Sequence, residues 1–114
     1  MKESKLGDFE ETILLIVGIL SDEAYAFRIA DEFEVQIKRP VSIGAVHSTL
    51  NRMADKGFLK SEMSEATAER GGRRKRIYTI TGSGQKALEI SRELKMSLWN
   101  QFPAFAGGKL NFSF

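Results

Sequence analysis

Residues 38–57 read KRPVSIGAVHSTLNRMADKG, and this stretch predicts a short turn followed by a helix. Pro40 ends the element before it, because the residue preceding a proline is pushed out of the helical region. Ser42 stands where an N-cap belongs, and Gly57 stands where a helix commonly stops. The stretch between them predicts a helix over about 42–56, with one apolar stripe facing inward: Val46, Leu50 and Met53.

The outward face of this helix is small and polar at its N-terminal end. It carries Gly44, Ala45, Ser48, Asn51, Arg52 and Asp55. Small residues let a backbone approach the floor of a DNA major groove, while Ser48 and Arg52 can reach base edges or phosphates. Ser42 adds a hydroxyl and backbone amides at the helix start, where the helix dipole favours an anion. The alternative for the same residues is a simple cap and a solvated face.

His47 flanks the apolar stripe, which leaves two roles open for it. Its side chain is expected either to pack half-buried or to contact a phosphate. Metal ligation is not expected, because the chain has no cysteine and no second histidine.

Two more helices are predicted upstream. Apolar residues at positions 6, 9, 13, 16, 17 and 20 repeat with a spacing of three and four, which predicts a helix over about 8–20. The segment 21–23 breaks that helix and is expected to supply an N-cap for a second one over about 24–37. The residues expected to face the core from the second helix are Phe27, Ile29 or Ala30, Phe33 and Ile37.

The segment downstream predicts a hairpin with a cationic tip. Two β-like runs, 58–63 and 76–80, flank a polar stretch that contains glycine. Residues 69–76 read ERGGRRKR and carry a net charge of about +4, whereas the whole chain carries +2. Such a concentration favours phosphate contact over a solvated loop. The cations are Arg70, Arg73, Arg74, Lys75 and Arg76, and the glycine pair between them would allow entry into a minor groove or simple flexibility.

The order helix, helix, short turn, helix, hairpin is that of a winged helix-turn-helix, so the predicted fold class is α+β and mostly helical. Thr81 is expected to cap a last helix over about 83–102, which Pro103 closes. We therefore expect a winged helix-turn-helix domain over 1–81, a C-terminal dimerisation helix over 82–102 and a tail over 103–114. A short strand and a disordered end both stay open for the tail.

Composition excludes several classes of protein. With 114 residues the chain has room for one domain. The absence of cysteine removes disulfides and the usual zinc sites, and it agrees with a reducing cytoplasm. No apolar run approaches the roughly 20 residues of a membrane span, so no membrane partner is expected. Neither an enzyme nor a bound cofactor or metal is expected, because no paired carboxylates, nucleophile and base, or phosphate loop stand at catalytic spacing.

Five segments in order resemble PadR-type transcriptional regulators, and the resemblance covers about residues 6–100. The segments are 6–10, 24–29, 41–53, 56–58 and 69–81. This resemblance implies a dimeric winged-helix repressor that binds a palindromic promoter site in double-stranded DNA and is often released by a small molecule. The recognition-helix pattern of the family maps onto Ser42, Gly44, His47, Leu50 and Arg52, and its wing maps onto 71–76.

Two residues depart from the family pattern. His47 stands where the family commonly has tyrosine, and Ala26 follows Tyr25 where glycine is usual. The resemblance implies that Tyr25, near the start of the second helix, touches a phosphate. Its alternative role is that of an aromatic residue at the edge of the core.

The last helix predicts a homodimer, because its apolar stripe is broader than packing within one domain requires. The expected interface residues are Phe9, Leu94, Leu98, Trp99 and Phe102. Trp99, the single tryptophan, is expected either to fill the interface core or to line a pocket for a planar aromatic effector, as in some members of the resembling family.

These predictions lead to one main function and one alternative. The main function is a sequence-specific DNA-binding transcriptional regulator. The alternative is a winged-helix interaction module whose cationic hairpin binds an acidic protein. Both interactions weaken as salt rises, so a sequence-specific footprint on DNA separates them.

Overall fold

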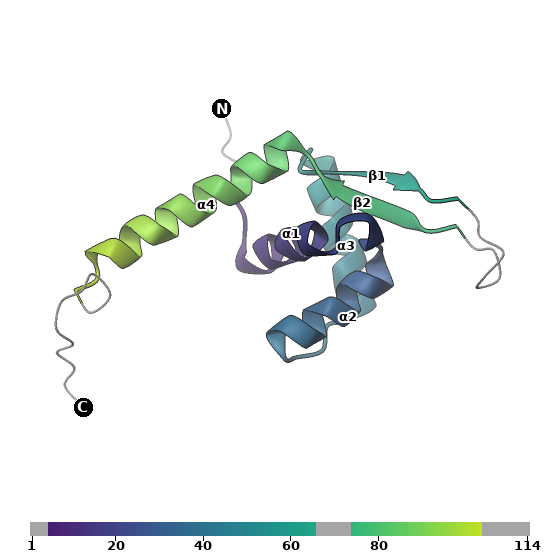
Figure 1. Cartoon of the computed structure of the whole chain (residues 1–114), viewed down its shortest axis with the longest axis horizontal. Coiled ribbons are helices and arrows are strands. Elements are labelled where there is room, and N and C mark those ends of the chain that lie inside the picture. Colours follow the sequence, from purple (N-terminus) through teal and green to yellow (C-terminus); the bar gives the residue numbers. More distant parts are fainter. Residues whose placement is uncertain (1–4, 66–73, 104–114) are drawn as a thin grey trace.

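The computed structural model describes residues 5–65 and 74–103 and has the predicted winged helix-turn-helix order (Figure 1). The elements in chain order are α1 Asp8–Leu20, a 3₁₀ turn η1 Ser21–Glu23, α2 Ala26–Ile37, α3 Ile43–Asp55, β1 Leu59–Met63, β2 Arg76–Ile80 and α4 Gly82–Gln101. The fold class is therefore confirmed as mostly helical α+β.

Helix α1 lies at the centre of the domain. Its buried residues are Ile13, Leu14, Ile16, Val17 and Leu20. It contacts α2, α3, α4 and β2. Each fully buried side chain of this kind contributes about 1.5–3 kcal/mol relative to an exposed one. Among the described elements, α1 supplies more of the buried core than any other.

Helix α3 follows the prediction closely at both ends. The Ser42 hydroxyl accepts a hydrogen bond from the Ala45 amide at 3.0 Å. After the helix, Gly57 has a φ of +83°, a left-handed conformation that favours glycine. Thr49 joins the expected apolar stripe and is only 1 % exposed, which the sequence did not predict.

Helix α2 differs from its prediction in two respects. It begins at Ala26 with Tyr25 as N-cap, and segment 21–23 forms the 3₁₀ turn instead of capping it. Phe27 and Ile37 were predicted to face inward, and this was wrong: they are 66 % and 39 % exposed. The prediction for Ile29 and Phe33 is confirmed, and with Ala26 they form the buried stripe, which also satisfies the three-and-four spacing.

Strands β1 and β2 form an antiparallel hairpin, in which Leu59 pairs with Ile80 and Met63 with Arg76. The Tyr78 amide donates a hydrogen bond to the Ala24 carbonyl at 2.9 Å, and the Tyr78 side chain is buried. The hairpin is therefore fixed to the turn that precedes α2. We call it the wing.

Helix α4 begins against the wing, runs beside α1, to which Lys95 bridges, and then extends beyond the other helices (Figure 1). The Thr81 hydroxyl accepts from the Gly84 amide at 3.1 Å and donates to the Gly57 carbonyl at 2.6 Å. Gly84 is buried so closely that an added Cβ would lie 2.3 Å from the Phe58 carbonyl oxygen. Within residues 5–65 and 74–103, no helix is long and apolar enough to cross a membrane.

Candidate nucleic-acid interface

A groove of about 440 Å³ lies where the start of α2, the outward face of α3 and the base of the wing meet. We call it the wing groove. It is lined by Tyr25, Ala26, Phe27, His47, Asn51, Arg74, Lys75, Arg76 and Tyr78. Among these lining residues there are three permanent cations and no carboxylate. The groove therefore favours an anion with apolar or aromatic parts.

The three cations of the wing groove are held by contacts with neighbouring residues. Arg74 Nε donates to the Ser64 carbonyl at 2.9 Å, and Arg76 Nη1 donates to the Ser61 hydroxyl at 3.0 Å. Because a guanidinium has five N–H donors, each arginine keeps donors for a ligand. The wing thus presents its charges in a defined arrangement.

Tyr25 joins the wing to α2. The Lys75 ammonium lies 4.6 Å from the centre of the Tyr25 ring, which is a cation–π contact. The ring is half-buried and lines the wing groove. Tyr25 is therefore an aromatic at the edge of the core that also faces the cationic surface, and its contact with a phosphate stays a prediction.

Two substitutions at Tyr25 are expected to distinguish the contribution of its ring to DNA binding from that of its hydroxyl. Tyr25→Phe keeps the cation–π contact, whereas Tyr25→Leu also loses it, at a cost of about 0.5–1 kcal/mol. We expect the leucine variant to bind DNA about two- to fivefold more weakly than the phenylalanine variant, measured by fluorescence anisotropy. Equal affinities of the two variants would mean that the cation–π contact between Lys75 and Tyr25 does not contribute to DNA binding.

The start of α3 is exposed beside the groove. Ser42, Gly44 and Ser48 are exposed, and Ala45 is half-buried. The Ser48 hydroxyl donates to the Ala45 carbonyl at 3.3 Å. An added Cβ at Gly44 would meet nothing within 4 Å, so no packing within the described chain requires glycine there.

His47 is exposed and lines the wing groove, so the half-buried alternative for it was wrong. Four further residues line the groove without having been predicted as site residues: Ala26, Phe27, Asn51 and Tyr78. Asn51 stands one helical turn after His47, and this spacing was the available signal. Phe27 was instead assigned to the core, because an apolar side chain gives no sign of an exposed role.

Arg52 lies apart from the wing groove. Its Nε donates to Glu10 Oε2 at 3.1 Å, and its Nη2 donates to the Thr49 hydroxyl at 3.2 Å. The pKa of Glu10 lies below its ordinary value, mainly because the Gly7 amide donates a hydrogen bond to its carboxylate. The positive charges of Arg52 and Lys56 lower this pKa further. Partial burial has the opposite effect on this pKa and is outweighed. Glu10 is therefore ionised at neutral pH, and the pair joins α3 to α1.

The remaining predicted residues lie elsewhere. Arg73 and the glycine pair of the wing tip are outside the described residues. Phe9 is half-buried and packs edge-on against Phe33 of the same chain, with ring centres 5.6 Å apart. The other predicted interface residues are exposed: Leu94, Leu98, Trp99 and Phe102. Their part in a dimer stays a prediction.

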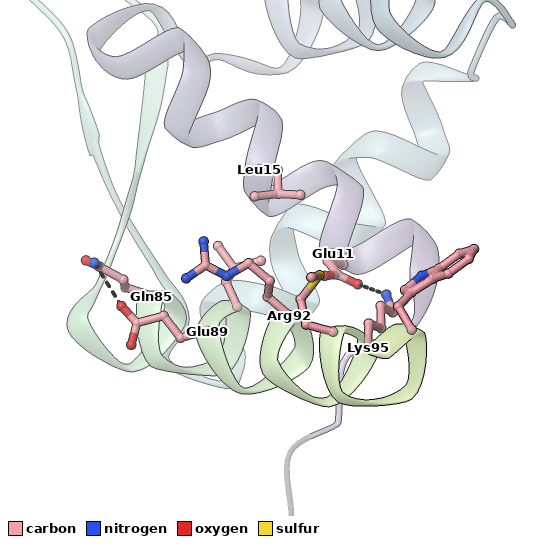
Figure 2. Close-up of a pocket in the computed structure, with 9 residues that line it drawn as sticks. Glu11, Leu15, Gln85, Glu89, Arg92 and Lys95 are labelled. Atoms are coloured by element: carbon pink, nitrogen blue, oxygen red, sulfur yellow. Dashed lines mark hydrogen bonds and ion pairs between the residues drawn. The ribbon is translucent and has the colours of Figure 1, made fainter. Parts of the chain in front are cut away.

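A second groove, of about 420 Å³, separates α1 from α4. Figure 2 shows Glu11 and Lys95 bridging it, with Leu15 on α1 and Arg92 on α4 also facing it. The Glu11 carboxylate raises the pKa of Lys95 above its ordinary value. Leu88, Met96 and Trp99 complete an apolar wall, so Trp99 lies at a hollow as well as on the exposed face of α4.

The molecule has a helix-turn-helix whose second helix, α3, is exposed, and a basic groove lies between this helix and the wing. These features define a winged helix-turn-helix DNA-binding protein. The model of the PadR-like family of transcriptional regulators matches residues 14–90. The chain belongs to this family, and its function is therefore DNA-binding regulation of transcription.

Solved structures agree with this assignment. A PadR-like transcription factor from Bacteroides fragilis is 26% identical, with a TM-score of 0.65, and the match covers 79% of this chain and 82% of that one. A PadR family transcription regulator from Clostridium difficile is 29% identical, with a TM-score of 0.58, over 80% of this chain and 96% of that one. RosR of H. salinarum shares the fold, at 24% identity and a TM-score of 0.63 over 82% and 77%. No curated protein matches the sequence significantly.

Proposed function

We propose that this chain is a dimeric, sequence-specific transcriptional repressor that acts in the cytoplasm on a palindromic operator in double-stranded DNA. The observation that supports DNA binding is the wing groove, which is rich in cations, free of carboxylates and lined in part by α3. In this proposal Arg74, Lys75 and Arg76 contact phosphates, which position the protein. The residues at the start of α3 contact base edges, which specify the sequence.

Dimerisation is supported by the exposed apolar face of α4. The exposed side chains are Ile90, Leu94, Met96, Leu98, Trp99 and Phe102. An apolar face of this length is a liability for a single chain, and a second copy would cover it. A two-fold dimer would place two α3 helices about 34 Å apart, one turn of duplex, which is the geometry that reads a palindrome.

Selection of bound duplexes from a random pool tests the function and the dimer together. We expect an enriched palindrome whose half-sites are centred about 10 base pairs apart. Enrichment of a single unrepeated site would contradict the dimer. No enrichment at all would contradict sequence-specific binding and favour the alternative, an acidic protein partner.

Gly44 offers a direct test of whether α3 enters the major groove. Gly44→Ala is expected to leave the domain folded and to stabilise it by up to about 1 kcal/mol, because alanine favours helix and nothing obstructs its Cβ. The same methyl would keep the backbone from the base edges, so affinity for the selected duplex is expected to fall about tenfold. A variant that binds as well as wild type would place α3 away from the groove floor.

Release by an effector is the last part of the proposal. A planar aromatic molecule is expected to bind beside Trp99, against the apolar wall of the groove between α1 and α4 or in its counterpart within the dimer. Trp99 is the only tryptophan, so its emission reports binding directly. The effector site would be elsewhere if aromatic compounds that release the DNA left Trp99 emission unchanged.

A further inference from the structure

Arg52 makes two side-chain hydrogen bonds to its own chain, although it lies on the helix proposed to read DNA and about half of its side chain is exposed. Its guanidinium donates through Nε to Glu10 and through Nη2 to Thr49. Thr49 is 1 % exposed, so this second contact anchors the guanidinium at the edge of the core. Arg52 is also absent from the residues that line the wing groove.

Glu10 is equally fixed. Its Oε1 accepts a hydrogen bond from the Gly7 amide at 3.0 Å, which completes the N-terminal cap of α1. Its Oε2 receives Arg52 and lies 3.9 Å from the Lys56 ammonium. The Glu10 side chain is only 14% exposed, so its carboxylate is partly shielded from water and from salt. An ion pair held at both ends in this way constrains geometry more than a loose surface pair does.

The position of this pair matters because it lies at the C-terminal end of α3. An apolar stripe alone holds a helix against a core but permits small changes in tilt. Between Arg52 and Gly44 the helix rises by about 12 Å, so a tilt of about 5° at one end moves the other by about 1 Å. Base contacts tolerate errors of only about 0.5 Å.

We propose that Glu10 and Arg52 are positioning residues that set the angle of α3 on DNA, and that Arg52 acts through Glu10 instead of touching the duplex. This inference rests on the proposed function and revises the role expected for Arg52 from the sequence. Asn51, which does line the wing groove, is left as the last residue of α3 that faces the duplex.

A double-mutant cycle tests the inference: Glu10→Gln, Arg52→Met and the two combined. Glutamine keeps an oxygen for the Gly7 amide and removes the charge. The measured quantity is the discrimination ratio, the Kd for random duplex divided by the Kd for the selected duplex, at constant salt and at a temperature where circular dichroism shows every variant folded. A general loss of positive charge weakens binding to both duplexes and therefore cancels in this ratio. A measurement of stability alone would not report discrimination between the duplexes.

We expect each single substitution to lower the discrimination ratio about fivefold, and the combined variant to lower it no further, because both remove one interaction. Asp8→Asn is the matched control. It removes a carboxylate from the same turn of α1, but that side chain is fully exposed and its ion pair is with Lys95 of α4. Its ratio is expected to equal that of wild type.

Two results would overturn the inference while leaving the proposed function intact. If the two losses multiply, or if only Arg52→Met loses discrimination, then Arg52 contacts DNA directly. If Asp8→Asn lowers the discrimination ratio as much as Glu10→Gln, then the effect comes from a general loss of stability in α1. A wild-type protein that does not discriminate between duplexes would instead overturn the proposed function itself.

Discussion

Replacing Gly84 by alanine is expected to lower the melting temperature of the protein by about 10 °C. The new Cβ would lie 2.3 Å from the Phe58 carbonyl oxygen and 3.0 Å from the Ile80 side chain. The carbonyl is backbone, so it cannot turn aside as a side chain can. The clash outweighs the gain of about 1 kcal/mol in helix propensity and leaves a net loss of about 2 kcal/mol.

Gly82→Ala is the matched control for this prediction. It makes the same change two residues earlier in α4, where an added Cβ meets nothing within 4 Å. Its melting temperature is expected to equal or exceed that of wild type in thermal unfolding followed by circular dichroism. Equal melting temperatures for the two variants would mean that α4 does not dock on the wing as closely as described.

Removing the three wing cations is expected to weaken DNA binding about 100-fold at 0.1 M salt, and by a similar factor on every duplex. The change is Arg74→Gln, Lys75→Gln and Arg76→Gln together. Each lost phosphate contact lowers the slope of log affinity against log salt by about 0.9, so the slope is expected to fall by about 2–3. Anisotropy titrations at several salt concentrations, with selected and random duplexes, measure both quantities.

The control for the wing variant is Lys86→Gln, which removes an exposed cation from α4, outside the wing groove. Its affinity for DNA is expected to stay within about twofold of wild type, and its salt slope within about 0.3. A wing variant that lost affinity for the selected duplex alone would contradict the phosphate role. In that case the wing would read sequence, and α3 would not be the sole reader.

The local elements could be predicted from the sequence because their signals are local. The periodicity of α1, the Ser42 and Thr81 caps and the Gly57 stop each depend on residues within one or two turns. The same holds for the wing groove in outline, since the cations of the wing adjoin strand β2 and Asn51 lies on the predicted outward face of α3.

The parts that could not be predicted depend on long-range contacts. Two apolar stripes fit α2 equally well by spacing, and only the packed structure selects the one that leaves Phe27 outside. The hydrogen bond from Tyr78 to Ala24 joins backbone groups, which have no signature in the sequence. Glu10 and Arg52 are 42 residues apart, and a charged residue has many possible partners at that distance.

The central place of α1 has a consequence for how the domain is made. All the partners that α1 contacts in the described chain, from α2 to α4, are synthesised after it. A 13-residue helix is marginal in water by itself, so its apolar stripe stays uncovered while they emerge. At about 5–20 residues per second, the interval between Leu20 and Ile80 lasts several seconds. During that time the nascent chain exposes its most apolar segment, which makes it a target for chaperones and for aggregation before it can touch DNA.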